Sequence, residues 1–296
     1  MIALIDGDIL VHAAAFSREV RRYEIHGRTL SFRYKKEAVA HCKDAKIDTR
    51  LINQVRTADY DLDKLRYAID NMMDDILERT GATEYFLFFS GRDVFRHRIG
   101  ADPVRGSTYK TNRRPENKPL MLEESKEILR EYQHFSHPEL EADDLLGIFQ
   151  GPDSIICSID KDLLQIPGRH FDIRKKEFKL VTQASGWKHF CMQLLTGDAV
   201  DGIHGLPGIG AVKAAKLLDK MQSESTSSME ILHKIDALYR DLGLTYMTDS
   251  ALKLWILRRP LCGPFKHANP MSKHDALTTY LNFEQLQMEL GLGKLT

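Results

Sequence analysis

Residues 154–162 read SIICSIDKD, an unbroken apolar run that ends in Asp160 and Asp162. Two other runs have the same character, IALID at 2–6 and EYFLFF at 84–89. Continuous apolar runs of this length are typical of strands that are buried on both faces of a parallel sheet. Apolar residues at helical spacing lie between or beside these runs, at 62–79, 121–132 and 143–149. Strands that alternate with helices predict an α/β fold with a mainly parallel sheet flanked by helices.

The remainder of the chain is more varied. Residues 171–181 indicate an antiparallel hairpin, and 187–195 and 211–221 indicate helices on either side of a Gly-rich turn. Residues 17–60 fit either a hairpin or a loose insertion, and the chain after 229 is mainly helical to about 257. We therefore expect an α/β core at 1–196 and a second, helical part at 197–296.

The composition is that of an ordinary soluble protein. The 296 residues are 43% hydrophobic and 28% charged, and the formal net charge is zero. No apolar run is long enough to span a membrane, and the first residues lack the layout of a signal peptide. We expect a cytoplasmic protein, in the host cytoplasm if a phage encodes it. The four scattered cysteines favour neither a zinc site nor a disulfide framework.

Acidic residues gather where the predicted strands end and where helices begin. The carboxyl ends of parallel strands meet at one edge of a sheet, and Asp160 and Asp162, two apart in extended chain, point to the same side. Nine carboxylates form the candidate set: Asp6, Asp93, Glu141, Asp143, Asp144, Asp160, Asp162, Asp198 and Asp201. A single Asp at a strand end is more often a cap or turn residue. A whole set of repelling carboxylates instead predicts hard divalent ions, which take oxygen ligands.

A basic segment lies between the second and third strands. Residues 92–118 hold eight Lys or Arg against three acids. We expect Lys110 to act as an electrophile at a scissile phosphate, Arg113 to hold that phosphate bidentately, and Tyr109 to stack on a base. Arg114 adds a further cation to this basic segment, which we expect to bind DNA. The alternative is an ordinary solvated loop.

The Gly-rich turn reads GIHGLPGIGAVKAA at 202–215. Glycines such as Gly208 and Gly210 let a phosphate approach the backbone, and the helix that follows points its amides at it. Lys213 and Lys216 would add phosphate contacts, which fix position without reading base sequence. The carbonyls of the turn suit a monovalent cation. The alternative is a helical hairpin with a structural role alone.

In these motifs and in their order, the chain resembles the 5′-nuclease family, the flap endonuclease and 5′–3′ exonuclease group, in its short phage or bacterial form. The resembling stretches cover about residues 1–220 and are IDGD at 5–8, SGRD at 90–93, YKTNR at 109–113, EADD at 141–144, SIDKD at 158–162 and TGDAVD at 196–201. The resemblance implies a helical arch at about 94–133 and a helix-hairpin-helix that grips duplex DNA, often with K+ in its turn. It also implies that all nine carboxylates surround two or more Mg2+ or Mn2+ ions.

The expected function is metal-dependent hydrolysis of DNA in replication, as a 5′–3′ exonuclease or a structure-specific flap endonuclease. Expected partners are DNA with 5′ ends, flaps or nicks and RNA–DNA hybrids; no membrane is expected, and the chain should be a monomer. Two alternatives remain open. A PIN-like ribonuclease would lack the hairpin around Gly208, and a non-catalytic DNA-binding module of the same fold would be expected to lose acids.

Overall fold

The computed structural model describes residues 1–28, 30–100, 109–111, 118–225 and 227–258. The chain forms two compact units. One, here called the sheet unit, comprises 1–6, 77–114 and 134–296; the other, the insert unit, comprises 7–76 and 115–133. Within the described residues, no helix has the length and apolar character that a membrane crossing requires.

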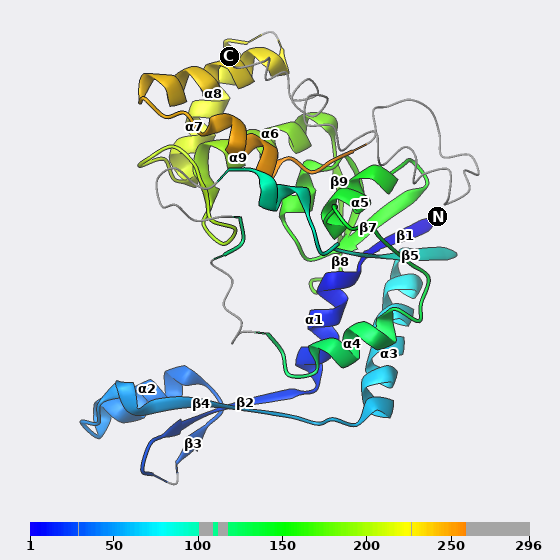
Figure 1. Cartoon of the computed structure of the whole chain (residues 1–296), viewed down its shortest axis with the longest axis vertical. Helices are drawn as coiled ribbons and strands as arrows, with labels where there is room; N and C mark the ends of the chain where they lie inside the picture. Colours follow the sequence, from blue (N-terminus) through cyan, green and yellow to red (C-terminus); the bar gives the residue numbers. More distant parts are fainter. Residues whose placement is uncertain (29, 101–108, 112–117, 226, 259–296) are drawn as a thin grey trace. The chain divides into compact units, whose positions relative to one another are not determined.

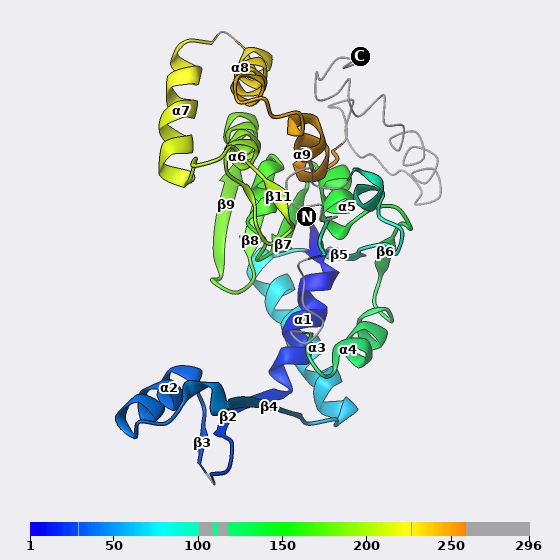
Figure 2. The same cartoon turned by 60° about the vertical axis from the view of Figure 1, so that its left-hand side comes forward.

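The sheet unit is built on six strands in the order β6-β5-β1-β7-β8-β9 (Figure 1; β6 is labelled in Figure 2). Their bounds are β1 Ile2–Asp6, β5 Glu84–Phe89, β6 His134–Ser136, β7 Ser154–Ser158, β8 Gly168–Asp172 and β9 Glu177–Val181. All neighbours run parallel except β8 and β9, which are antiparallel. The predicted α/β fold with a mainly parallel sheet is confirmed, and so is the hairpin expected at 171–181.

The central strand β1 sets the register that brings acids together. Leu4 lies opposite Phe86 of β5 and Ile156 of β7. Asp6 therefore ends β1 at the same edge of the sheet at which β7 ends with Ser158. Leu4 and Ile156 are almost completely buried, as expected for strands whose side chains are covered.

The helices of the sheet unit are α5 Ala142–Phe149, α6 Gln183–Thr196, α7 Ala211–Ser223, α8 Ser228–Asp241 and α9 Met247–Leu254, with short 3-10 turns η2 Phe95–Arg98 and η4 Asp162–Gln165. Helix α5 packs on β1 and β5, while α6 packs against α7, α8 and α9 (Figure 2). The Tyr239 hydroxyl on α8 donates to the Leu194 carbonyl on α6 at 2.6 Å. The C-terminal helices thus share one apolar core with the sheet.

Helices α6 and α7 form the predicted helical hairpin. Between them lies a two-residue strand pair, β10 Gly197–Asp198 with β11 Ile203–His204. The two backbones approach so closely that a Cβ at Gly205 would sit 2.3 Å from the Gly197 nitrogen. In the turn that follows, Gly208 has φ +72°, a conformation that favours glycine.

The insert unit holds a second sheet and four helices. Its elements are α1 Gly7–Ser17, β2 Glu19–Ile25, β3 Ser31–Phe32, α2 Lys35–Asp44, the 3-10 turn η1 Thr49–Leu51, β4 Ile52–Ala58, α4 Leu122–Leu129 and most of α3 Leu62–Thr80. The strands are antiparallel in the order β3-β2-β4, and α4 packs on α1. Residues 17–60, apart from residue 29, thus form three strands and a helix and not a loose insertion. Much of the predicted arch, 101–108 and 112–117, lies outside the described residues.

Candidate metal centre

Asp6 and Asp160 are tied together by one serine at the carboxyl edge of the sheet. The Ser158 hydroxyl donates to Asp6 Oδ2 at 2.8 Å and accepts from the Asp160 backbone amide at 3.0 Å. Asp6 is 3% exposed. The Asp160 carboxylate in turn accepts from the Asp162 amide at 2.8 Å. The end of β1 and the loop after β7 therefore hold three acids in fixed positions.

Helix α5 brings the next acids to the same edge. Glu141 is its N-cap residue, and Asp143 lies in its first turn. The Ser90 hydroxyl, just after β5, accepts from the Ala142 amide at 3.0 Å and so anchors the helix start. The positive end of the helix dipole offsets part of the repulsion between carboxylates placed here.

A first group of negative charge surrounds Asp143. Burial, then Asp6, Asp160 and Glu141, raise the pKa of Asp143 well above its usual range, and Lys110 opposes them. These four acids come from three separate elements of the sheet unit. A site that raises a carboxyl pKa in this way disfavours the ionised form unless a cation compensates.

A second group surrounds Asp162. Burial, then Asp160 and Asp198, raise the pKa of Asp162 to about 7, with Asp201 adding to the effect and Lys161 opposing it. Asp162 Oδ1 accepts from Gln193 Nε2 at 2.9 Å. Because Asp160 acts on both Asp143 and Asp162, the two groups are neighbours that share one carboxylate.

Lys110 supplies the cation closest to these acids. Its Nζ lies 2.5 Å from Glu141 Oε1 and 3.7 Å from Asp201 Oδ2, and its backbone amide donates to the Asp201 carbonyl at 3.1 Å. Burial would raise the pKa of Glu141, but Arg96 and Lys110 together lower it below its usual value. Lys110 therefore stands between the start of α5 and the loop after β10.

Asp144 has a different environment from its neighbour Asp143. It is fully buried, and Arg96 binds both of its oxygens, at 2.5 and 2.7 Å. The amides of Leu257 and Glu141 donate to the same carboxylate. Arg96 is itself 1% exposed, so it belongs to the interior and not to the basic surface that residues 92–118 suggested. The Asp144 carboxylate thus binds Arg96 and two backbone amides, whereas Asp143 faces other carboxylates.

Asp93, Tyr109 and the predicted residues of the helical hairpin have different surroundings. Asp93 is exposed after β5, and among the described residues no hydrogen bond or ion pair joins its carboxylate to the other acids. Tyr109 is buried, and its hydroxyl donates to Glu141 Oε2 at 2.9 Å, a position that gives no support to base stacking. Lys213 Nζ donates to the Gly208 carbonyl at 3.1 Å, while Gly210 and Lys216 are exposed.

Two predicted residues, Arg113 and Arg114, lie outside the described residues.

The donor chemistry fits a hard divalent ion. Over the described part of the chain, no three Asp, Glu, His or Cys side chains already stand together as a complete ligand set. Burial, together with repulsion from neighbouring carboxylates, nevertheless raises the pKa values of Asp143 and Asp162. Carboxylate oxygens are the ligands that Mg2+ and Mn2+ prefer, so cation binding would relieve this repulsion.

The raised pKa of Asp162 predicts a pH-dependent stability without metal. An unfolded aspartate titrates near 3.9, but folded Asp162 titrates at about 7. Protonated Asp162 therefore contributes its full stabilisation of the folded protein below about pH 4. This contribution to the free energy of unfolding is lost as pH rises through 7. We expect the free energy of unfolding in EDTA to fall by on the order of 1–2 kcal/mol from pH 5 to pH 8. Urea denaturation at each pH measures it. Asp162→Asn should make the profile less steep, with Asp143, whose pKa is also raised, contributing to the remaining slope; a parental slope in this variant would contradict the assignment.

Comparison with known proteins gives sequence relatives but no matching family model. An exodeoxyribonuclease of Enterobacteria phage T3 is 32% identical over 134 residues, which is 41% of this chain and 44% of the relative. The thermostable DNA polymerase I of Thermus aquaticus is 30% identical over 241 residues, 73% of this chain and 28% of the polymerase. A 5′–3′ exonuclease of Buchnera aphidicola is 29% identical, over 46% of this chain and 52% of the relative. The chain thus spans about half or less of each of these relatives.

Among solved structures, the D15 protein of phage T5 co-crystallised with metal ions has a TM-score of 0.46 at 15% identity, covering 85% of this chain and 93% of that one. The T5 D15 flap endonuclease in a pseudo-enzyme-product complex with DNA and metal ions has a TM-score of 0.44 at 15% identity, with the same coverage. The sequence relatives confirm the resemblance to 5′ nucleases that the motifs indicated: the chain is similar to proteins named exodeoxyribonuclease, 5′–3′ exonuclease and DNA polymerase I.

Proposed function

We propose that this chain is a divalent-metal-dependent 5′ nuclease that hydrolyses DNA phosphodiester bonds, as a 5′–3′ exonuclease or a flap endonuclease. The observation that carries the proposal is the pair of charge groups around Asp143 and Asp162, joined by Asp160 at the carboxyl edge of the sheet. Sequence relatives named exodeoxyribonuclease and 5′–3′ exonuclease support the reaction class.

The acids divide into two sets of prospective ligands. Asp6, Glu141, Asp143 and Asp160 would hold one Mg2+ or Mn2+, and Asp162, Asp198 and Asp201 would hold a second with Asp160 between them. Bound ions supply Lewis-acid stabilisation and lower the pKa of an attacking water. Two candidate ligands remain: Asp93, which lies exposed after β5, and Asp144, whose carboxylate binds Arg96.

The cations of the chain have the complementary task. Lys110 holds its ammonium beside Glu141 and Asp201, where negative charge grows on a phosphate during hydrolysis. We assign Arg113 and Arg114 to the same strand of DNA. The turn at Gly208 and Gly210, with the exposed side chains on α7, would hold duplex phosphates, and its carbonyls are the candidate K+ site.

A substrate panel tests this function directly. Purified protein is incubated with a labelled 5′-flap DNA, a blunt DNA duplex, an RNA–DNA hybrid and a matched RNA, each with Mg2+ or EDTA. We expect short products from the 5′ end of DNA with Mg2+ and none with EDTA. Cutting of RNA alone would favour the PIN-like ribonuclease, and binding without cutting would favour the non-catalytic module.

The substrate range, the oligomeric state and the location of the protein are three further proposals. Activity on the hybrid would show that RNA primers paired with DNA are substrates. Sedimentation of the active protein tests the proposed monomer. We place the protein in the cytoplasm, where replicating DNA is available.

A further inference from the structure

The module formed by residues 18–58 in the insert unit carries a strong local charge. It holds eleven Lys or Arg and five Asp or Glu, although the whole chain has no net charge. A positive excess within one module of a neutral chain is a local electrostatic footprint of the kind that polyanions recognise. None of the acids of the candidate metal centre belongs to this module.

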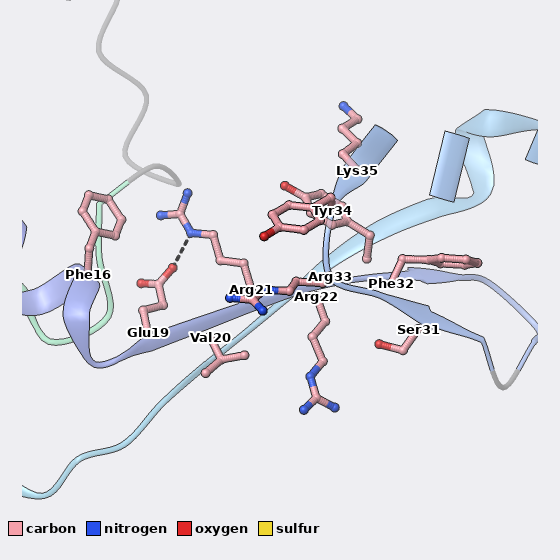
Figure 3. A pocket seen from close by; sticks show the side chains of 11 residues that line it. Phe16, Glu19, Val20, Arg21, Arg22, Ser31, Phe32, Arg33, Tyr34 and Lys35 are labelled. Atoms are coloured by element: carbon pink, nitrogen blue, oxygen red, sulfur yellow. Dashed lines mark hydrogen bonds and ion pairs between the residues drawn. The ribbon is translucent and has the colours of Figure 1, made fainter. Parts of the chain in front are cut away.

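Four of the eleven cations line a groove of about 930 Å³ along β2 (Figure 3). Strand β3 pairs with Tyr23 and Glu24 near the end of β2. Among the described residues, no strand pairs with the earlier part of β2 on the side of β3, so this edge of β2 is open. The groove is lined by four cationic and four aromatic side chains, one carboxylate and two further residues: Phe16, Glu19, Val20, Arg21, Arg22, Tyr23, Ser31, Phe32, Arg33, Tyr34 and Lys35.

The single carboxylate of the groove is already neutralised. Glu19 accepts from Arg21 Nε at 2.6 Å and from Arg56 at 2.8 Å, and its side chain is 1% exposed. The hydrogen bond from Arg56 is the main reason that the pKa of Glu19 falls to about 2. At neutral pH the Glu19 carboxylate is therefore ionised and paired with Arg21 and Arg56.

The other groove cations lack such a partner. Arg22, Arg33 and Lys35 are exposed, and no ion pair joins them to a carboxylate among the residues that the structure describes. Arg22 comes from β2, whereas Lys35 is the first residue of α2, where Figure 3 shows it. A chain of phosphates laid along the open edge of β2 could therefore meet cations from both elements.

The aromatic rings favour unpaired bases over a duplex. Tyr34 is 49% exposed and Phe16 38% exposed, although large aromatic side chains are usually buried. The guanidinium of Arg33 lies 5.5 Å from the centre of the Tyr34 ring, and that of Arg21 lies 4.6 Å from the Phe16 ring. Exposed rings beside cations are the combination with which proteins bind single strands, because every base has a face that can stack.

We propose that this groove binds single-stranded nucleic acid, with Arg22, Arg33 and Lys35 on phosphates and Tyr34 stacked on a base. The inference goes beyond the proposed nuclease function and does not depend on it. Binding in EDTA separates the groove from cleavage, and a matched control variant separates the groove from the other DNA contacts that we propose for the chain.

The probe is a fluorescein-labelled 15-nucleotide oligo-dT, and fluorescence anisotropy of the full chain in EDTA gives the affinity over a range of salt concentrations. The groove variant combines Arg22→Gln, Arg33→Gln and Lys35→Gln. The matched control combines Lys43→Gln, Lys46→Gln and Arg50→Gln, which removes the same charge from exposed positions of the same module. Urea denaturation first shows that both are folded.

We expect the groove variant to bind oligo-dT at least tenfold more weakly and to lower the salt slope by about 2, since each phosphate contact on a single strand contributes about 0.7. The control should change affinity less than about threefold. Tyr34→Leu, which leaves every charge in place, should weaken binding about fivefold or more.

Equal losses in the groove and control variants would overturn the proposal, because charge alone would then explain binding. A 15-base-pair duplex that binds more tightly than oligo-dT and is unaffected by Tyr34→Leu would overturn the assignment to single strands. If the groove variant proves unstable, Tyr34→Leu alone decides, because parental affinity in that variant contradicts stacking.

Discussion

Asp143→Ala should lower the rate of Mg2+-dependent DNA cleavage by about three orders of magnitude or more. The carboxylate lies among Asp6, Asp160 and Glu141, so its removal takes a ligand from the centre of the first charge group. Lewis-acid stabilisation by a bound metal is worth several kcal/mol in the transition state, and about 4 kcal/mol corresponds to a thousandfold in rate. Single-turnover cleavage of a labelled 5′-flap DNA in Mg2+ measures the effect.

Stability and binding separate this effect from a folding defect. Because its surroundings raise the pKa of Asp143, the variant in EDTA at pH 8 should be at least as stable as the parent. DNA affinity in EDTA should change little, since no phosphate contact is removed. Asp153→Ala is the matched control, because Asp153 is exposed at the opposite end of β7. Parental cleavage by Asp143→Ala would remove this residue from the proposed centre.

Arg96→Met should lower the free energy of unfolding by about 3–5 kcal/mol, the usual cost of leaving a buried charge without its partner. Arg96 binds Asp144 through two nitrogens and also donates to the carbonyls of Lys253 and Trp255 at 2.9 and 2.5 Å. It therefore joins η2, α5 and the segment after α9. Urea denaturation at pH 7.5 measures the loss.

Exposed and conservative variants make the Arg96 prediction specific. Arg98→Met removes an arginine two positions away that is 52% exposed and pairs with Glu139 at 2.7 Å, so it should cost less than about 1 kcal/mol. Arg96→Lys keeps the charge without the planar fork and should fall between the two. A cost below about 1 kcal/mol for Arg96→Met would show that the buried network contributes little.

The parts of the fold that sequence predicted are those in which burial leaves a local signal. The runs at 2–6, 84–89 and 154–159 became β1, β5 and β7, because central strands of a parallel sheet are apolar at almost every position. The apolar spacing at 62–79 became α3 for the equivalent helical reason. Strand β2 carries no such signal, because alternate positions in it are exposed, and residues 17–60 therefore stayed undecided.

The candidate site was predictable in its acids but not in their individual roles. Asp143 and Asp144 are adjacent in one motif, yet the first faces other carboxylates and the second faces Arg96. A buried arginine has no sequence signature, and the contacts of Arg96 come from residues 45 to 159 positions away. Only the three-dimensional arrangement shows that Arg96 leaves the basic surface and that Tyr109 turns its hydroxyl to Glu141.

We expect the acids around Asp143 and Asp162 to bind the divalent cations with which the protein cleaves DNA. Anomalous scattering from crystals of the active protein soaked in Mn2+ locates these ions. Manganese should lie within ligand distance of Asp143 and Asp160, with a second ion toward Asp162 and Asp198, and the first ion should be lost in Asp143→Ala. Manganese bound elsewhere, with no density between these side chains in a protein that still cuts DNA, would show that cleavage does not depend on these carboxylates.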